Sequence, residues 1–218
     1  TTTVSVWLVN LITGDVKAQS AEYNQQISRG EDVISRIVYA SKGNGSRELS
    51  NLVVGTINEL IDRVCIAANI HSDEIYKAVI AGNSTMIHLL LQVSANSIRL
   101  EPFITAINHI PVLKADELGI RISPSAPVDC LPGVASYVGS DITAGVLSSG
   151  MYATEKLTLF MDVGTNGEIV LGSSDWLVTC ACSAGPAFEG AGVKDGMRAT
   201  EGAIEDVWIN RETYEAEY

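Results

Sequence analysis

The chain reads LTLFMDVGTNGEIVLG over residues 157–172, and this stretch decides both the fold and the candidate chemistry. An apolar strand carries Asp162 into a glycine-rich turn, and a second strand follows the turn. A carboxylate placed there can hold a hydrated Mg2+, because this ion keeps several of its waters. Gly164 and Gly167 let the backbone approach a polyphosphate, successive turn amides form an anion-binding concavity, and Thr165 adds a hydroxyl donor. The pattern predicts a site for Mg2+ and phosphate.

The same turn has a simpler interpretation. Asn166-Gly167 is the dipeptide most typical of a type I′ turn between two strands, so the stretch could be an ordinary hairpin. The two interpretations are compatible, because a phosphate-binding loop can itself be a hairpin.

The start of the chain repeats this arrangement of a polar loop followed by a hairpin. Three threonines, Thr1, Thr2 and Thr3, precede an alternating strand over 4–9, a turn at 13–15 and a return strand over 16–18. Two such units, one opening each half of the chain, predict an internally duplicated architecture with a nucleotide between two similar lobes. The alternative for the threonines is a polar, frayed terminus.

Between these units the pattern predicts alternating helices and strands. The expected helices are 30–40, a long helix capped by Ser46 with one apolar face, a turn at 72–76, a helix after residue 84 and a helix after residue 133 that ends at Gly150. A buried strand is expected over 77–81. The proline-rich stretch 96–131 reads as an irregular insertion with one strand near 110–113. In the second half we expect strands over 157–161, 168–171 and 177–182, with Pro186 in the first turn of a following helix.

Two further sites are candidates. Gly82, Asn83 and Ser84 lie where a strand meets a helix, and free amides at a helix start bind anions, although capping by Asn83 or Ser84 explains the same residues. Asp141 could orient Mg2+ or a water, or Ser140 and Asp141 could simply cap a helix.

The histidines and cysteines favour structural roles. His88 lies between apolar residues of a predicted helix and reads as a satisfied core histidine rather than a base. Cys180 and Cys182 share one face of a predicted strand, where a redox or metal pair is possible, but no second pair lies near them in sequence. Four cysteines in 218 residues do not predict a disulfide framework.

Composition excludes several classes of function. The 218 residues are 46% hydrophobic, with a mean hydropathy of +0.20, so a substantial core is expected. A net charge of -12 disfavours binding to nucleic acid or to an anionic membrane. No apolar run reaches the length of a spanning helix, and the start lacks the basic segment of a signal peptide, so a cytoplasmic location is the expectation.

These residues carry a family resemblance. The stretch 162–168 resembles the second phosphate loop of the acetate kinase, sugar kinase, Hsp70 and actin superfamily, and Thr1–Thr3 resembles the tail of its first phosphate loop. The stretches 81–91, 137–142 and 182–191 narrow the resemblance to ATP-dependent reductive activators of corrinoid proteins. That family carries an N-terminal [2Fe-2S] domain and uses ATP to help return an inactive Co(II) corrinoid to Co(I).

The resemblance implies α/β, ribonuclease H-like lobes, with residues 1–154 in the first lobe and 155–218 beginning the second. It implies ATP and Mg2+ as cofactors, a corrinoid protein or corrinoid iron-sulfur protein as partner, and a homodimer. Asp162 and Asp141 would hold Mg2+, and Glu168 would position water or act as general base. The implied nucleotide contacts are Thr1, Thr2, Thr3, Gly82, Asn83, Ser84, Gly164, Thr165, Asn166, Gly167 and Gly185.

The chain also departs from the family pattern. The Asp and Gly that precede the threonines of the first loop, a glycine-rich adenosine motif and the cluster cysteines have no counterpart in it. We therefore expect a piece of a longer protein that is incomplete for ATP turnover. The alternatives are a small-molecule kinase of the same superfamily and a dimerisation or docking module with a vestigial phosphate loop.

Overall fold

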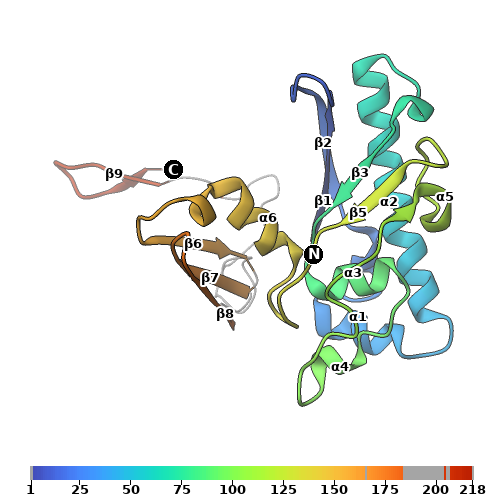
Figure 1. Cartoon of the computed structure of the whole chain (residues 1–218). Helices are drawn as coiled ribbons and strands as arrows, with labels where there is room; N and C mark the ends of the chain where they lie inside the picture. The colour runs from blue at the N-terminus through green and yellow to red at the C-terminus, as the bar shows by residue number, and fades with distance from the viewer. Residues whose placement is uncertain (1, 165, 184–203, 205–206, 218) are drawn as a thin grey trace. The chain divides into compact units, whose positions relative to one another are not determined.

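The computed structural model describes residues 2–164, 166–183, 204 and 207–217. Two compact units divide the chain, Thr1–Gly150 and Met151–Tyr218, and each is described by itself. Both contain β-strands, and the α-helices among the described residues lie in the first, so the expected α/β class is confirmed (Figure 1). The lobe boundary after residue 154 stays a prediction. Among the described residues, no helix is both long and apolar enough to cross a membrane.

The strands of the first unit form two sheets. β1 (Thr3–Val9) and β2 (Val16–Tyr23) form an antiparallel hairpin, and the expected return strand is longer than the sequence indicated. The second sheet has the order β3-β5-β4, with β3 (Ala78–Ile80) parallel to β5 (Pro127–Cys130) and β4 (Leu113–Lys114) antiparallel to β5. β5 was not predicted. Pro127 stands at its first position, where a proline is tolerated in a strand.

One long helix, α2 (Gly45–Ala68), organises the core of the first unit, running beside both sheets (Figure 1). The apolar face predicted for it is confirmed, since Leu49, Leu60 and Val64 are buried. The cap predicted at Ser46 is wrong, because the N-cap is Asn44 and Ser46 lies inside the first turn. Residues from α2 and from the β3-β5-β4 region form the main cluster: Ile61, Cys65, Ala115, Ile120, Ile122, Ala126 and Val128.

The remaining helices of the first unit are short. α1 begins at Val33 rather than at residue 30, because Asp32 and Ser35 form a capping box. The segment between residue 133 and α6 is irregular rather than helical, whereas the stop predicted at Gly150 is confirmed by its left-handed backbone with φ 71°. The helical elements are η1 (Gln25–Ser28), α1 (Val33–Ala40), η2 (Ser72–Glu74), α3 (Ser84–Leu90), α4 (Asn96–Arg99), α5 (Ala115–Leu118) and α6 (Ser140–Ser149).

The second unit is built on an antiparallel meander of three strands. β6 (Thr158–Val163), β7 (Asn166–Gly172) and β8 (Leu177–Ser183) pair in chain order, which confirms the three expected strands. A short 3-10 turn, η3 (Met151–Ala153), precedes them, and the hairpin β9 (Trp208–Ile209) and β10 (Ala216–Glu217) follows. The helix expected at Pro186 lies outside the described residues.

The turns of the β1-β2 and β9-β10 hairpins have the same hydrogen-bond pattern. In the first, the Asn10 side chain accepts from the backbone amides two and three residues on, and the Gly14 amide donates to the Asn10 carbonyl at 2.8 Å. In the second, Asn210 accepts in the same way and the Tyr214 amide donates to the Asn210 carbonyl at 2.8 Å. Both turns place their fifth residue at positive φ, 78° for Gly14 and 58° for Tyr214.

Candidate functional site

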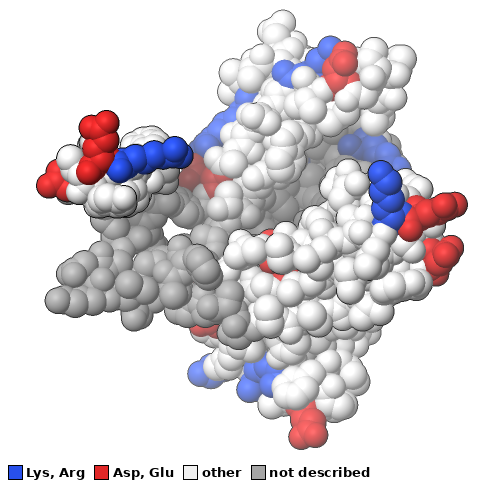
Figure 2. All heavy atoms as spheres, turned by 90° about the vertical axis from the view of Figure 1, so that its left-hand side faces the viewer, with Lys and Arg blue, Asp and Glu red and all other residues white. Residues whose placement is uncertain are grey.

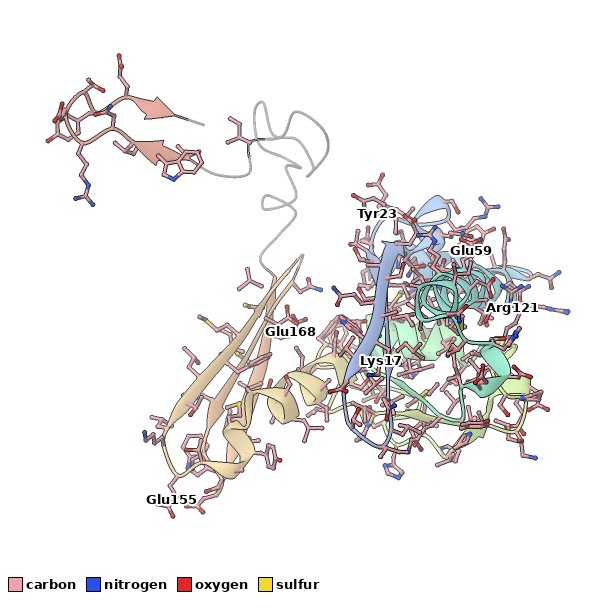
Figure 3. All side chains as sticks on the ribbon, turned by 90° about the horizontal axis from the view of Figure 1, so that it is seen from above. Lys17, Tyr23, Glu59, Arg121, Glu155 and Glu168 are labelled. Atoms are coloured by element: carbon pink, nitrogen blue, oxygen red, sulfur yellow. The ribbon has the colours of Figure 1, made fainter. Side chains whose placement is uncertain are left out.

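The carboxylates predicted at the glycine-rich turn face each other across two strands. Asp162 of β6 and Glu168 of β7 are Cα partners in the antiparallel ladder, so their side chains lie on the same face of the sheet. Asp162 is exposed and Glu168 is half-buried. Figure 3 shows Glu168 near the end of the meander, with Glu155 at the opposite end. The register therefore brings together the two residues to which the sequence assigned metal and water chemistry.

The turn itself is a hairpin, but not the one that the dipeptide indicated. Asn166 and Gly167 belong to β7, and Val163 pairs with Gly167, so both residues of the dipeptide lie in the strand that follows the turn. Gly167 is not among the glycines with positive φ, which a type I′ turn centred on Asn166-Gly167 requires at that position. The predicted hairpin is right and its predicted turn type is wrong. Thr165 lies outside the described residues.

Two of the turn's glycines have internal roles. The amide of Gly164 donates to the carbonyl of Asn166 at 2.9 Å, so this amide is directed into the turn. Gly167 is buried beside its partner Cys182, whose Sγ donates to the Gly167 carbonyl at 3.2 Å. A Cβ on Gly167 would lie 3.0 Å from that sulfur. The close approach at Gly167 is therefore made by a neighbouring strand, and the phosphate contacts of both glycines stay a prediction.

In the first unit, the threonines are tied into the sheet. The Thr2 carbonyl accepts from the Asn24 amide at 2.8 Å, and Thr3 is the first residue of β1, paired with Tyr23. The alternative of a frayed terminus is therefore wrong for Thr2 and Thr3. Thr1 lies outside the described residues.

The loop between β3 and α3 is satisfied within the protein. Asn83 caps α3, its side-chain oxygen accepting from the Thr85 amide at 2.9 Å, as the capping alternative predicted. The Ser84 hydroxyl donates to the Ala135 carbonyl at 2.7 Å. With only seven residues, α3 is also too short to offer a strong dipole at its start. Anion binding by Gly82, Asn83 and Ser84 has no further support here and stays a prediction.

Gly82 links this loop to α6. The Gly82 amide donates to the Ser140 hydroxyl at 3.0 Å, and the Gly82 carbonyl accepts from both the hydroxyl and the amide of Ser140, each at 3.0 Å. Asp141 bonds locally, because its Oδ1 accepts from the Ile142 amide at 3.0 Å. Neither Ser140 nor Asp141 is the cap of α6, since Gly139 occupies that position without a side-chain bond.

The sequence pattern did not identify Gly139 as a residue in close contact with another part of the chain. A Cβ there would lie 2.6 Å from the Ser84 amide nitrogen and 2.7 Å from the Asn83 Cα. The starts of α3 and α6 therefore touch through backbone, and only glycine fits at this position. The run of small residues over 139–145 was the available signal, because small residues permit helices to cross closely.

His88 is structural, as predicted. It is 1% exposed, its Nδ1 lies 2.7 Å from the Ser84 carbonyl, and its Nε2 lies 3.1 Å from the Ala106 amide. The Ala106 amide can only donate, so Nε2 accepts this hydrogen bond. Nδ1 therefore carries the ring proton and donates a hydrogen bond to the Ser84 carbonyl. Burial lowers the pKa of His88, which keeps the ring neutral.

The four cysteines have free thiols, two buried and two exposed. Cys65 and Cys130 lie in the core, and burial raises the pKa of Cys130 to about 11. Cys180 and Cys182 lie on one face of β8, as expected. The described residues contain no group of three or more His, Cys, Asp or Glu side chains that could hold a metal ion. Gly185 lies outside the described residues.

Comparison with known protein families matches both units. The RACo middle region matches residues 1–154, and the C-terminal domain of RACo, the ASKHA domain, matches residues 156–218. The chain is 39% identical over 208 residues to a corrinoid activation enzyme RamQ of Eubacterium limosum, covering 95% of this chain and 35% of that protein. It is 38% identical over 76 residues to a [Co(II) methylated amine-specific corrinoid protein] reductase of Methanosarcina barkeri, covering 35% of this chain and 14% of that protein.

A solved structure matches the whole chain. It is a reductive activator for corrinoid, iron-sulfur protein, superposed with a TM-score of 0.89 at 50% sequence identity, covering 100% of this chain and 35% of that one. The chain thus spans about a third of the length of such relatives. Because the middle-region match alone covers more than half of its residues, the chain belongs to the RACo family of corrinoid activators.

Proposed function

We propose that this chain is the nucleotide-binding part of a reductive activator that couples ATP to the reduction of a Co(II) corrinoid protein to Co(I). The observation that carries the proposal is the Asp162–Glu168 pair, located at a glycine-rich hairpin inside the segment matched by the ASKHA domain. The names of the relatives supply the corrinoid substrate class, and the superfamily supplies ATP.

The two carboxylates fit a hydrated Mg2+. Side chains directly opposite on an antiparallel pair have Cβ atoms only about 5 Å apart, and like charges at that spacing destabilise the sheet. A divalent cation removes that repulsion, and Mg2+ binds through one or two carboxylates while keeping waters and nucleotide phosphates as its other ligands. Asp162, exposed at the strand end, is the residue proposed to hold the ion's waters. When bound, the ion supplies charge neutralisation at the phosphates.

Glu168 is proposed to position the attacking water. It is half-buried beside Asp162, so its carboxylate is partly shielded while it still reaches solvent. Asp141, in the first turn of α6, is a second candidate for holding Mg2+. The support for this role is weaker than for Asp162, because one carboxylate oxygen of Asp141 already accepts a hydrogen bond from the following amide.

Phosphate contacts are proposed for Thr1, Thr2 and Thr3 in the first unit and for Gly164, Thr165, Asn166 and Gly167 in the second. The ordered start of β1 supports this for Thr2 and Thr3, since their backbone is held by Asn24 and Tyr23. A phosphate contact is also proposed for Gly185, on the basis of the family resemblance. A corrinoid protein is the proposed partner, and a homodimer the proposed assembly.

Calorimetry on the full-length protein tests the proposal. Asp162→Asn keeps the size of the side chain and removes its charge, so we expect Mg-ATP affinity to fall at least about tenfold, the equivalent of ~1.4 kcal/mol. Asp175→Asn is the matched control, an exposed acid of the same unit in the connection between β7 and β8, and it should bind normally. Unchanged Mg-ATP affinity in Asp162→Asn would remove the basis of the assignment.

A further inference from the structure

Asp141 lies beside the loop between β3 and α3. A Cβ on Gly139 would lie 2.6 Å from Asp141 Oδ1 and also 2.6 Å from the Ser84 amide nitrogen. The carboxylate oxygen and that nitrogen are therefore no farther apart than twice this distance. The sequence indicated two separate candidate sites, one at Gly82, Asn83 and Ser84 and one at Asp141. The fold brings the residues of both together within the first unit.

Ser140 fixes the start of α6 to this loop. Its hydroxyl accepts from the Gly82 amide at 3.0 Å and donates to the Gly82 carbonyl at 3.0 Å. The Ser140 amide donates to the same carbonyl at 3.0 Å, and the Asp141 amide does so at 3.4 Å. Ser140 is 1% exposed, so these bonds lie in a low-dielectric environment, where they are stronger than in water. The backbone that carries Asp141 is therefore held in place relative to Gly82.

The side chain of Asp141 is held as well. Its Oδ1 accepts from the Ile142 amide at 3.0 Å and lies over Gly139, where a Cβ would come within 2.6 Å of this oxygen. A residue other than glycine at position 139 would push the carboxylate away or displace the β3-α3 loop. Ser140 and Gly139 thus act on Asp141 in two ways, the first on its backbone and the second on its side chain.

These contacts exceed what the start of a helix requires. A serine at a helix start ordinarily caps it, by accepting from an amide of its own helix. Ser140 instead bonds in both directions with Gly82, 58 residues earlier in the chain. The N-cap of α6 is Gly139, which makes no side-chain bond. The first turn of α6, which contains Asp141, is therefore organised by the distant loop rather than by a local cap.

Binding of a cation depends on how single carboxylates are placed. On the face shown in Figure 2, acidic and basic side chains occur in small groups of mixed sign, separated by uncharged surface, so this face offers no single acidic patch. Mg2+ also demands near-ideal geometry from a small number of protein ligands. Groups that orient such ligands are important for this reason, and their loss typically costs about 10–100-fold in metal affinity or activity.

We propose that Ser140 and Gly139 are positioning residues for Asp141, and that they hold its carboxylate beside the β3-α3 loop as a ligand for hydrated Mg2+. Ser140 acts through the backbone, by its bonds to Gly82, and Gly139 acts by leaving space for the side chain. The assignment rests on the proposed function, which includes Mg2+ bound together with a nucleotide.

A double-mutant cycle on the full-length protein tests the positioning role. The variants are Ser140→Ala, Asp141→Asn and the two combined. The readout is the affinity for Mn2+, a paramagnetic substitute for Mg2+, in the presence of a non-hydrolysable ATP analogue, with free Mn2+ measured by electron paramagnetic resonance. We expect Ser140→Ala to weaken Mn2+ binding by about tenfold or more. The double variant should bind no more weakly than Asp141→Asn, because Ser140 then has no carboxylate to position.

Ser50→Ala is the matched control. Ser50 is 3% exposed and its hydroxyl donates to the carbonyl of Leu90, the last residue of α3, at 3.0 Å. The same substitution there removes a buried hydrogen bond of the same unit at the other end of α3. Both serine variants should lower the midpoint of urea unfolding, whereas the Mn2+ affinity should fall in Ser140→Ala and not in Ser50→Ala. Circular dichroism shows that each variant is folded before the titration.

Three results would overturn the positioning role. Unchanged Mn2+ affinity in Ser140→Ala would show that Asp141 keeps its place without the hydroxyl. An equal loss from Ser140→Ala in the wild-type and Asp141→Asn backgrounds would assign Ser140 to the stability of the unit. Wild-type affinity in Asp141→Asn would remove Asp141 as a ligand and leave the Asp162 site intact. Failure of the proposed function differs from all three, because the wild type itself would then bind no Mn2+ with the nucleotide analogue.

Discussion

Asp162 and Glu168 occupy directly opposite positions of the β6-β7 ladder, one pair before the pair of Val163 with Gly167 that closes the hairpin. Two negative charges at this spacing repel each other when no cation is bound. The Mg2+ site proposed above therefore rests on two carboxylates of paired strands rather than on a loop.

The first prediction concerns Mg2+ binding by this pair. Glu168→Gln should bind the ion more weakly than the wild type, because the variant keeps only one of the two opposed carboxylates. Adding Mg2+ should raise the melting temperature of the wild type and have a smaller effect on the variant. Differential scanning calorimetry with EDTA and with Mg2+ measures both values.

The comparison variant is Glu155→Gln, which removes an acid at the other end of the meander (Figure 3). It should leave the response to Mg2+ unchanged. An equal Mg2+ response in all three proteins would show that the carboxylate pair does not bind the ion.

The hairpin around this pair could be predicted from the sequence, and its register could not. The apolar strands and the glycines indicated a strand, a turn and a strand, which the structure has. Asn166-Gly167 suggested the wrong central residues, because local turn preference is weaker than the ladder that pairs Gly167 with both Val163 and Cys182. Whether two strands pair in one register or in a register shifted by one residue depends on contacts between residues far apart in the sequence.

Dependence on contacts between distant parts of the sequence also explains why strand β5 was not predicted. Its four residues start with Pro127, and the prolines around them indicated a loop. What makes them a strand is pairing with β3, almost fifty residues earlier, and with β4. The long helix α2 was predictable, since its apolar periodicity is local, but its cap was not, because Asn44 makes no side-chain cap bond that a pattern could reveal.

The second prediction concerns the contact between α3 and α6. Gly139→Ala places a methyl group 2.6 Å from the Ser84 nitrogen and 2.7 Å from the Asn83 Cα, and both are backbone atoms that a side-chain rotation cannot move. We expect a loss of ~1–3 kcal/mol in the free energy of unfolding, as for overpacked sites. Urea denaturation followed by circular dichroism measures it.

Gly55→Ala is the matched control, with an expected effect of opposite sign. Gly55 lies inside α2, and a Cβ there meets no atom within 4 Å. Alanine should stabilise the helix by ~0.5–1 kcal/mol. If Gly139→Ala proved as harmless as Gly55→Ala, the close backbone contact of the two helix starts would be incorrect.

The third prediction compares the two hairpin turns. Gly14 and Tyr214 occupy the same position of the same turn, both at positive φ, where a side chain other than that of glycine is strained by ~1 kcal/mol or more. Tyr214→Gly should therefore stabilise the β9-β10 hairpin, and Gly14→Ala should destabilise the β1-β2 hairpin. Amide hydrogen exchange of each hairpin, measured by mass spectrometry, should show slower exchange in the first variant and faster exchange in the second. The opposite pair of changes would mean that the turns differ in conformation.

The fourth prediction concerns pH and His88. Burial lowers the pKa of this histidine in the folded protein below the unfolded value of about 6.5. The unfolded chain therefore takes up the proton first as the pH falls. The contribution of His88 is fully present above about pH 6.5 and is lost as the pH falls through the folded pKa, with a slope of at most ~1.4 kcal/mol per pH unit.

The variant His88→Gln should separate this effect from the titration of carboxylates. It removes the acceptor of the Ala106 amide and the donor to the Ser84 carbonyl, so we expect a loss of ~1–3 kcal/mol at pH 7.5. Between pH 7 and pH 5.5, the stability of the wild type should fall more steeply than that of the variant, since only the wild type has the buried ring to protonate. His109→Gln removes an exposed histidine and is the control. Parallel pH profiles for the wild type and His88→Gln would mean that His88 is accessible to protons in the folded protein, contrary to its burial between α3 and the Ala106 loop.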